Sequence, residues 1–337
     1  MRILVGISGG VDSALAAKRL MDQGHEVEGA ILIMHEHTDV AAAEEVAASL
    51  GINLHKIYIT SEFLAVMSNF VEEYTHGRTP NPCIICNERV KFSRLYNYAD
   101  VMGYDAIATG HYASVKKIGD RYALAIPEDA KKDQTYMLYR LPQNILEKLI
   151  LPLSEGTKVQ VRAEAEEAGI SAANRTDSQE ICFIPDGDHA GYIESIKGKC
   201  PEGDFVDEDG RIIGRHKGII HYTVGQRKGL GISLGARAFV TAIDPETNRI
   251  TLSTSLMGKD SLTVSGIVYS GMANPIEEIE MNFDVRLRYS ATPVKATARL
   301  FPDGRAALTL EKPQIFAPGQ SAVFYRDGVV MLGGFID

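Results

Sequence analysis

The chain begins with a turn that constrains the rest of its fold. An apolar run at residues 3–5 leads directly into Gly6-Ile7-Ser8-Gly9-Gly10-Val11-Asp12-Ser13, and a helical pattern of apolar residues continues to Leu20. This order predicts a strand, a tight turn and a helix. The glycine pair lets the backbone turn sharply and approach a ligand, while Ser8 and Ser13 add hydroxyl donors beside the N–H groups that open the helix. The turn therefore predicts a site for anionic oxygens.

Two familiar phosphate-binding loops do not match this segment. The Walker loop ends in Lys followed by Ser or Thr, and the dinucleotide-binding fingerprint has three glycines at a different spacing. The stretch from Ser8 to Ser13 instead resembles the PP-loop of the ATP pyrophosphatase superfamily. That resemblance implies an enzyme that splits ATP between its α and β phosphates and adenylates an oxygen of its substrate. It also implies that residues 6–13 bind ATP.

The segments that follow alternate between strand-like and helical patterns. Apolar runs of strand length lie at 27–33, 54–59 and 106–109, and helical patterns lie at 41–50, 62–74 and 89–102. This alternation is typical of an α/β domain with a parallel sheet and helices on both faces. Ligands of such sheets bind at the carboxyl ends of the strands, so we expect Met34, Gly110 and His111 to lie beside the first turn.

The pattern changes to β structure near residue 198. Before it, we expect a hairpin at 113–126, a short helix ending near Leu141 and a helix at 158–168. Beyond it, short alternating segments indicate antiparallel strands. These expected strands lie at 219–224, 238–243, 249–253, 262–269, 284–289, 294–301, 305–310 and 322–325. The expected domains are a PP-loop ATP-binding catalytic domain at 1–197, a central β module at 198–257 and a C-terminal antiparallel β-barrel at 258–337.

Charge and hydropathy exclude several functions. The 337 residues carry a formal net charge of −9, which argues against binding nucleic acid by bulk charge. The candidates for a local basic face are Lys131-Lys132, Arg227-Lys228, and the group Arg286, Arg288, Lys295 and Arg299. No apolar run reaches the roughly 18–20 residues that span a bilayer, and the amino terminus lacks a signal-peptide pattern. We therefore expect a cytoplasmic protein.

Four cysteines, Cys83, Cys86, Cys182 and Cys200, carry the remaining chemistry. In a long cytosolic chain they favour catalysis or metal binding over a disulfide framework. Cys83 and Cys86 follow two closely spaced prolines, which we expect to hold the backbone extended as a rigid loop that presents thiols. Cys200 lies outside any motif, so we expect it to be a plain small residue.

Motifs spread in order along nearly the whole chain resemble the bacterial tRNA-specific 2-thiouridylases. They are the turn at 6–13, Thr79-Pro80-Asn81-Pro82 with Cys86-Asn87, Ala108-Thr109-Gly110-His111-Tyr112, Lys132-Asp133-Gln134, Ile181-Cys182-Phe183, Gly225-Gln226-Arg227-Lys228-Gly229-Leu230-Gly231 and Pro318-Gly319-Gln320-Ser321-Ala322-Val323. The resemblance implies ATP-dependent 2-thiolation of uridine 34 in tRNAs for Lys, Glu and Gln. It also implies a cysteine desulfurase or a sulfur-relay protein as the sulfur donor.

The resemblance further implies roles for individual residues. ATP would be bound by residues 6–13 together with Met34 and Gly110, and Cys86 would be the nucleophile beside a persulfide carried on Cys182. The residues implied to line the target base are Asn81, Pro82 and Cys83. The residues implied to contact tRNA are His111, Lys132, Asp133, Gln134, Arg288, Tyr289 and Gln320.

Cys83 leaves two sulfur routes open. Many members of the family carry an aspartate at this position, and the change creates a Cys83-x-x-Cys86 pair with a distant Cys182. Three thiolates can hold three irons of a [4Fe-4S] cluster and leave the fourth iron open to a sulfide. In the other route, Cys182 delivers sulfur as a persulfide and Cys86 then closes a disulfide with it. A closed zinc site would need a fourth ligand.

The chemistry implied by the family requires that a carbonyl oxygen become a leaving group. Adenylation of uridine O2 achieves this, with loop N–H groups, Mg²⁺ and a basic residue stabilising the pyrophosphate. Asp12 would either position the metal or act as a carboxylate at the helix start. The base must leave the anticodon stack, and the β modules would grip the tRNA. The rivals are a PP-loop ligase that delivers ammonia and a nucleic-acid-binding protein that keeps the loop as a relic.

Overall fold

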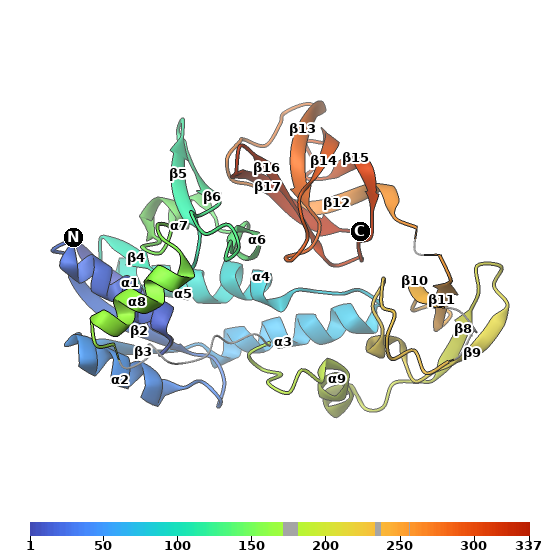
Figure 1. The fold of residues 1–337 in the computed structure, drawn as a ribbon, viewed down its shortest axis with the longest axis horizontal. Helices are drawn as coiled ribbons and strands as arrows, with labels where there is room; N and C mark the ends of the chain where they lie inside the picture. The colour runs from blue at the N-terminus through green and yellow to red at the C-terminus, as the bar shows by residue number, and fades with distance from the viewer. Residues whose placement is uncertain (171–180, 233–236, 256) are drawn as a thin grey trace.

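The first strand and its neighbours form a parallel sheet covered on both faces (Figure 1). In the computed structural model, which describes residues 1–170, 181–232, 237–255 and 257–337, this sheet has the order β3-β2-β1-β4-β7. Every pairing in it is parallel. Its strands are β1 (Arg2–Gly6), β2 (Glu26–Ile33), β3 (Leu54–Tyr58), β4 (Ala106–Ala108) and β7 (Leu149–Ile150). The predicted α/β class is confirmed.

Successive side chains of β1 enter different cores, because a strand alternates its faces. Ile3 and Val5 pack with helices α1, α2 and α8, whereas Leu4 packs with α5, α6 and α7. The helices of the first face are α1 (Val11–Asp22), α2 (Val40–Leu50) and α8 (Lys158–Glu167). Those of the second face are α5 (Phe92–Val101), α6 (Thr135–Leu138) and α7 (Gln143–Lys148). The sheet is therefore buried on both sides, as parallel strands require.

The segment that carries the first two cysteines is helical, and the prediction of an extended loop is wrong. Pro82 begins helix α4 (Pro82–Cys86), which continues through a π-helical turn, Asn87–Lys91, into α5. Proline is tolerated at the first helical position because the N–H that it lacks would have no helical partner there. The side chain of Asn81 caps this helix by accepting the Cys83 N–H at 3.2 Å.

Helix α3 (Thr60–Thr75) joins the parallel-sheet domain to the central module (Figure 1). Its Phe63 and Phe70 pack in one core with α9 (His189–Lys197) and with Phe205 of the central sheet. Although α3 has 16 residues, no helix within the described ranges is long and apolar enough to cross a membrane.

The central sheet is mixed rather than antiparallel as predicted, because its two middle strands, β8 and β11, run parallel. Its strands are β8 (Gly203–Val206), β9 (Ile212–His216), β10 (Phe239–Asp244) and β11 (Arg249–Ser253). The strand predicted at 219–224 is also wrong, since Ile219–His221 form a short 3-10 helix. Ile219 and Ile220 are successive residues that both enter the same core, which a strand with alternating faces does not allow.

Six antiparallel strands close the predicted C-terminal barrel in the order β12-β15-β14-β13-β16-β17, and β17 pairs back with β12. They are β12 (Lys259–Tyr269), β13 (Ile279–Arg286), β14 (Val294–Leu300), β15 (Ala306–Gln314), β16 (Ser321–Arg326) and β17 (Val329–Ile336). The hairpin of β5 (Ser114–Ile118) and β6 (Arg121–Ala125), which the sequence predicts, extends this sheet where Ala125 pairs with Val329. Closure removes the exposed strand edges.

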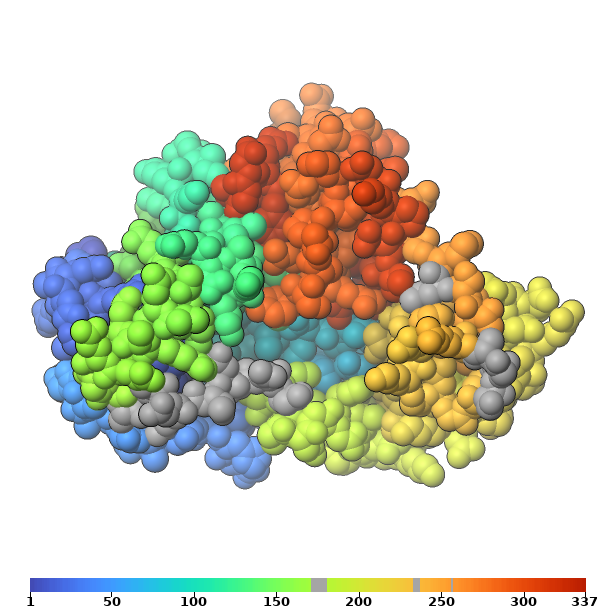
Figure 2. Space-filling model, viewed as in Figure 1, coloured from blue at the N-terminus to red at the C-terminus, as the bar shows by residue number. Residues whose placement is uncertain are grey.

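The barrel is docked on the segment around α6, and Figure 2 shows the orange and red barrel seated beside this green segment. An ion pair of 2.8 Å joins Arg286 of β13 to Asp133, whose side chain is only 2% exposed. Two tyrosines reinforce the contact, because Tyr136 donates to the Ser321 carbonyl at 2.9 Å and the Tyr139 hydroxyl lies 3.0 Å from the Ser321 hydroxyl. The barrel and the first domain therefore share a buried interface.

Removal of the Asp133 carboxylate tests this interface. Asp133→Ala should lower the free energy of unfolding by about 3 kcal/mol, because it leaves the Arg286 guanidinium buried without its partner. Asp284→Ala breaks the exposed pair that Asp284 forms with Lys295 at 3.1 Å on the same barrel. This variant should change the free energy of unfolding by less than about 1 kcal/mol. Denaturant unfolding measures both variants, and equal effects would contradict the proposed importance of the buried pair.

Candidate active site

The turn between β1 and α1 is built to receive an anion. Gly10 is the N-cap of α1 and has no side chain to cap the first N–H groups. The serine hydroxyls instead hold the turn, since the Ser8 N–H donates to Ser13 Oγ at 3.2 Å and that hydroxyl donates to the Gly10 carbonyl at 3.0 Å. Gly9 has a φ of +80°, and a Cβ there would lie 2.5 Å from the Cβ of Ala42. The turn therefore requires glycine at this position and fits a phosphate at the helix start.

The loops after β2 and β4 lie at the same edge of the sheet, because both strands flank β1. A Cβ on Gly110 would lie 2.5 Å from the carbonyl carbon of Asp12 and 2.7 Å from the Ser13 nitrogen, so only glycine fits against the turn. Met34 directly follows β2, and its N–H donates to Thr38 Oγ1 at 3.2 Å. The structure thus packs the loop after β4 against the first turn, and the loop after β2 lies at the same edge of the sheet.

Asp12 is paired with a lysine that the sequence did not single out. Lys158 Nζ lies 2.7 Å from both carboxylate oxygens of Asp12, and the Tyr112 hydroxyl donates to one of them at 2.8 Å. Lys158 is the first residue of α8, whose start is fixed by a capping box between Thr157 and Gln160. The capping box is a visible signal for the helix start, but the approach of Lys158 to the first turn depends on tertiary packing. A cation is therefore present beside the phosphate-binding turn.

His111 is a neutral imidazole in this environment. Its Nδ1 lies 2.9 Å from Thr109 Oγ1, and its ring packs 5.3 Å from that of Phe92. Burial and, to a smaller extent, the nearby Lys91 ammonium together lower the pKa of His111 to about 3. The side chain therefore acts as a neutral hydrogen-bonding group and not as a cation for phosphates.

Three of the four cysteines line one pocket. Cys83 and Cys86 reach it from α4, and Cys182 reaches it from the segment before α9, where its side chain is exposed. The pocket leaves a free volume of only about 10 Å³. The residues that complete its wall are Phe63, Val66, Pro82, Lys91, Ile181 and Phe183. All four cysteines are free thiols, so the predicted pair Cys86 and Cys182 meets in one pocket in the reduced state.

Lys91 is the charged group of this pocket, and sequence reasoning missed it. Burial raises the pKa of Cys86 to about 11 and also raises that of Cys182, while the Lys91 ammonium opposes both shifts. Burial alone would lower the pKa of Lys91, but the charges of Cys86, Cys83 and Cys182 raise it overall. The lysine therefore stays protonated and favours the thiolate forms of Cys86 and Cys182. Phe92, the residue after Lys91, packs its ring against that of His111, so the thiol pocket adjoins the phosphate-binding edge.

The residues implied to contact tRNA divide into two groups. Asp133, Gln134 and Gln320 are engaged within the protein: Asp133 pairs with Arg286, Gln134 accepts the Tyr112 N–H at 2.7 Å, and Gln320 donates to the Thr79 carbonyl at 2.7 Å. Tyr289 is 40% exposed, and Arg288 and Lys132 are partly exposed. The buried carboxylate of Asp133 holds the barrel in place, whereas Lys132, Arg288 and Tyr289 are at least partly exposed.

The metal sites expected from the sequence fit this arrangement poorly. Within the described ranges, no group of three or more His, Cys, Asp or Glu residues is arranged to hold a metal ion. Both carboxylate oxygens of Asp12 are engaged by Lys158. A pocket of about 10 Å³ holds at most one water, so the three thiols in this conformation leave no room for a four-iron cube.

Comparison with known proteins agrees with the domain order. Residues 1–186 match the tRNA methyl transferase HUP domain, residues 190–254 the tRNA methyl transferase PRC-barrel domain, and residues 259–336 the aminomethyltransferase beta-barrel domain. The "tRNA-specific 2-thiouridylase MnmA 1" of Clostridium botulinum strain Loch Maree is 41% identical, with 100% of this chain and 99% of that protein covered. The MnmA of strain Alaska E43 is 42% identical, with 100% and 98% covered.

Among solved structures, a 4-thiouridine synthetase in complex with RNA and bound ATP matches part of the chain. The match covers 58% of this chain and 50% of that one, with 18% sequence identity and a TM-score of 0.39.

The fold and the site define a PP-loop enzyme that has a pocket of thiols next to its phosphate-binding edge. The chain belongs to the family of tRNA-specific 2-thiouridylases, because relatives of that name match it from end to end at 41% and 42% identity. The resemblance noted in the sequence is thereby confirmed.

Replacement of Lys91 tests its action on the thiols. Lys91→Met removes the charge that lowers the pKa of Cys86 and Cys182, so both pKa values should rise and the thiolate fraction of both cysteines at a given pH should fall. In Lys91→Arg, which keeps the charge, the thiolate fraction should fall much less. Lys56→Met removes an exposed lysine paired with Glu44 and serves as the control. Alkylation rates of each cysteine, followed by mass spectrometry across pH, measure the effect. Unchanged rates in Lys91→Met would refute it.

Proposed function

We propose that the protein catalyses the ATP-dependent 2-thiolation of uridine 34, the wobble nucleotide, in tRNA. Family membership supports the reaction class. The observation that carries the proposal is the proximity of two chemically different sites: a phosphate-binding turn at the edge of a parallel sheet and a thiol pocket that adjoins it through Lys91 and His111. A bound nucleotide and a sulfur nucleophile can therefore react at the same carbonyl group of the substrate.

The first half-reaction activates the base. Uridine O2 attacks the α-phosphorus of ATP, the bond to the β-phosphate oxygen breaks, and pyrophosphate leaves. The first-turn N–H groups of α1 and the Lys158 ammonium are placed to stabilise the negative charge that develops on the phosphates. Mg²⁺ would enter with ATP, whose phosphate oxygens supply most of its ligands, and would neutralise part of that charge.

The second half-reaction replaces oxygen by sulfur. We propose that exposed Cys182 accepts sulfane sulfur from a cysteine desulfurase or a relay protein, and that its terminal persulfide sulfur attacks C2. AMP leaves with the former O2. Buried Cys86 then gives up its proton to water, with the Lys91 ammonium stabilising the thiolate that forms, and attacks Cys182 Sγ. This step releases 2-thiouridine and forms a Cys86–Cys182 disulfide that a reductant must open.

The persulfide route is preferred to the iron–sulfur route for a physical reason. The three thiols enclose too little space for a [4Fe-4S] cluster in this conformation. Two thiols of unequal exposure in one pocket match a carrier that is loaded from outside and a nucleophile that is protected from solvent. Cys83 is then an accessory thiol beside the base, next to Asn81 and Pro82.

The substrate tRNA requires more surface than the first domain offers. The target base must be pulled out of the anticodon stack to reach the pocket, at the start of α4. We propose that residues 1–197 carry the chemistry, whereas the module at 198–257 and the barrel at 258–337 grip the tRNA through Arg288, Tyr289 and their neighbours. The substrates are proposed to be the tRNAs for Lys, Glu and Gln, which the enzyme would meet in the cytoplasm.

Thionucleoside analysis tests this function. A strain that lacks the protein and its paralogues should contain no 2-thiouridine derivatives in digested tRNA, by mass spectrometry, and the wild-type gene should restore them. Cys86→Ser and Cys182→Ser should each fail to restore them. Cys200→Ser should succeed, because this free cysteine lies outside the thiol pocket. Unchanged thionucleosides in the deletion strain would contradict the assignment.

Cys83→Ser distinguishes the two sulfur routes. The persulfide route predicts that this variant keeps at least about a tenth of the wild-type activity, because Cys83 forms no bond in it. Iron and sulfide measurements on protein purified without oxygen accompany the assay. Loss of activity together with loss of bound iron would contradict the persulfide route and favour the cluster.

A further inference from the structure

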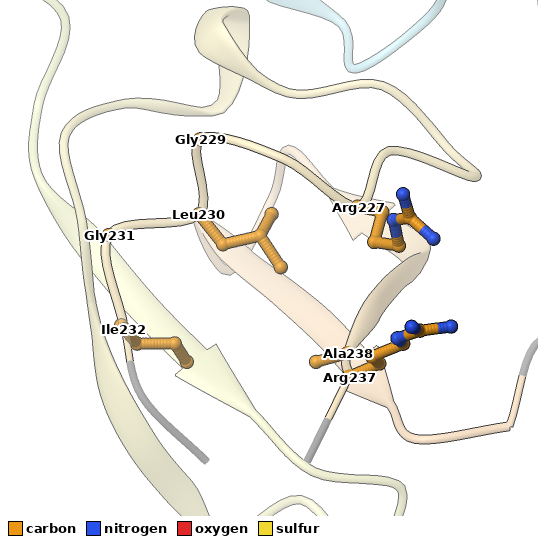
Figure 3. Close-up of a pocket in the computed structure, with 7 residues that line it drawn as sticks. All are labelled: Arg227, Gly229, Leu230, Gly231, Ile232, Arg237 and Ala238. Atoms are coloured by element: carbon orange, nitrogen blue, oxygen red, sulfur yellow. The ribbon is translucent and has the colours of Figure 1, made fainter. Parts of the chain in front are cut away.

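A second cavity, of about 440 Å³, lies in the central module and shares no residue with the thiol pocket. Its wall is made by the loop that ends the 225–231 motif and by the start of β10. Figure 3 shows Arg227 and Arg237 extending to the same side, with Leu230 facing the space next to them. The described residues that line it are Arg227, Gly229, Leu230, Gly231, Ile232, Arg237 and Ala238. None of these carries a negative charge.

Backbone pairing explains why two arginines from separate segments meet. The Gly225 N–H donates to the Val240 carbonyl at 2.8 Å, and the Val240 N–H donates to the Gln226 carbonyl at 3.0 Å. The chain just after Gln226 therefore runs beside the chain just before β10, which places Arg227 next to Arg237. The Gln226 side chain fixes the loop, because it accepts the Thr223 N–H at 2.9 Å and donates to the Lys228 carbonyl at 3.0 Å. The arginines thus emerge from an ordered scaffold.

The charges of these two arginines are uncompensated. Within the described part of the chain, neither Arg227 nor Arg237 forms an ion pair or a side-chain hydrogen bond, and both are exposed, although the protein has an excess of acidic residues. Arg286, Arg299 and Arg305 of the barrel, by contrast, each pair with a carboxylate. Each guanidinium group presents a planar fork of N–H donors that matches the oxygens of a phosphate, and both groups line the same cavity. Buried Leu230 and Ala238 add an apolar floor next to it.

We propose that this cavity binds a backbone phosphate of the tRNA substrate, with the attached nucleoside against Leu230. The barrel touches the same loop, because Arg288 Nη2 donates to the Val224 carbonyl at 3.2 Å. Two basic groups that lie far apart in the sequence thus form one surface that continues from the barrel onto the central module. The inference rests on tRNA being the substrate, and it assigns the central module a direct part in holding that substrate.

Binding of fluorescently labelled tRNA by the full-length protein at several salt concentrations tests the proposal. Arg227→Ala and Arg237→Ala should each weaken binding about tenfold, as expected for the loss of one charge-assisted hydrogen bond. In the double variant, log affinity should also fall less steeply with log salt concentration. The magnitude of the negative slope should decrease by about 1, because one phosphate contact is lost. Arg211→Ala is the matched control, since this exposed arginine of the same module lies outside the cavity.

The outcomes separate the inference from the function on which it rests. Wild-type affinity and salt slope in the double variant, or an equal loss in Arg211→Ala, would overturn the inference while the tRNA function stands. Failure of wild-type protein to bind tRNA would overturn both. Inorganic phosphate and uridine monophosphate serve as free-anion probes: if the double variant loses only their binding and keeps that of tRNA, the cavity is a free-anion site and the proposal is wrong. Equal melting temperatures verify that the variants are folded.

Discussion

A single π-helical turn sets the geometry on which the site depends. Lys91 follows Cys86 by five residues, and in a regular α-helix such residues point about 140° apart. The turn at Asn87–Lys91 widens the helix so that the two residues share one pocket, where the ammonium faces Cys83, Cys86 and Cys182. Without this irregularity, the Lys91 ammonium would not oppose the rise that burial causes in the pKa of Cys86 and Cys182. Single π turns inside helices are frequent at functional sites, and this one has a definite electrostatic effect.

The same helix connects the cysteine segment to the parallel-sheet domain. It begins after Asn81, carries Cys83 and Cys86, and continues into α5, which covers the parallel sheet. The barrel is held against the first domain by the Asp133–Arg286 pair and by the tyrosines around Ser321. Asp133, which the family resemblance implies at the tRNA, therefore has a second role, because it positions the barrel on the first domain.

Local signals in the sequence predicted most of the first domain. The glycine turn after β1, the strand–helix alternation and the hairpin at β5 and β6 all rest on residue patterns within a short window, and the structure has each of them. Pro82 was misread because its effect depends on whether it begins or interrupts a helix. Ile219 and Ile220 resemble a strand by composition, but their packing into one core requires a helical turn.

The charged partners of the site could not be predicted in the same way. Lys158 reaches Asp12 across 146 positions of sequence, and no local pattern encodes that contact. Lys91 lies close to Cys86 in sequence, but only the π turn brings its side chain to the thiols, and side-chain pattern does not reveal such a turn. The candidate site residues could therefore be predicted from the sequence, whereas the charged partners that set their electrostatic environment depend on the tertiary fold.

The most direct test of the central claim follows the oxygen atom that is replaced. Uridine 34 of the substrate tRNA is labelled with heavy oxygen (¹⁸O) at O2, and AMP is isolated after reaction with ATP and a persulfide donor. If O2 attacks the α-phosphorus, each 2-thiouridine formed should yield one AMP that carries the label in its phosphate. Label found in water, with unlabelled AMP, would contradict adenylation of the base and with it this account of the site.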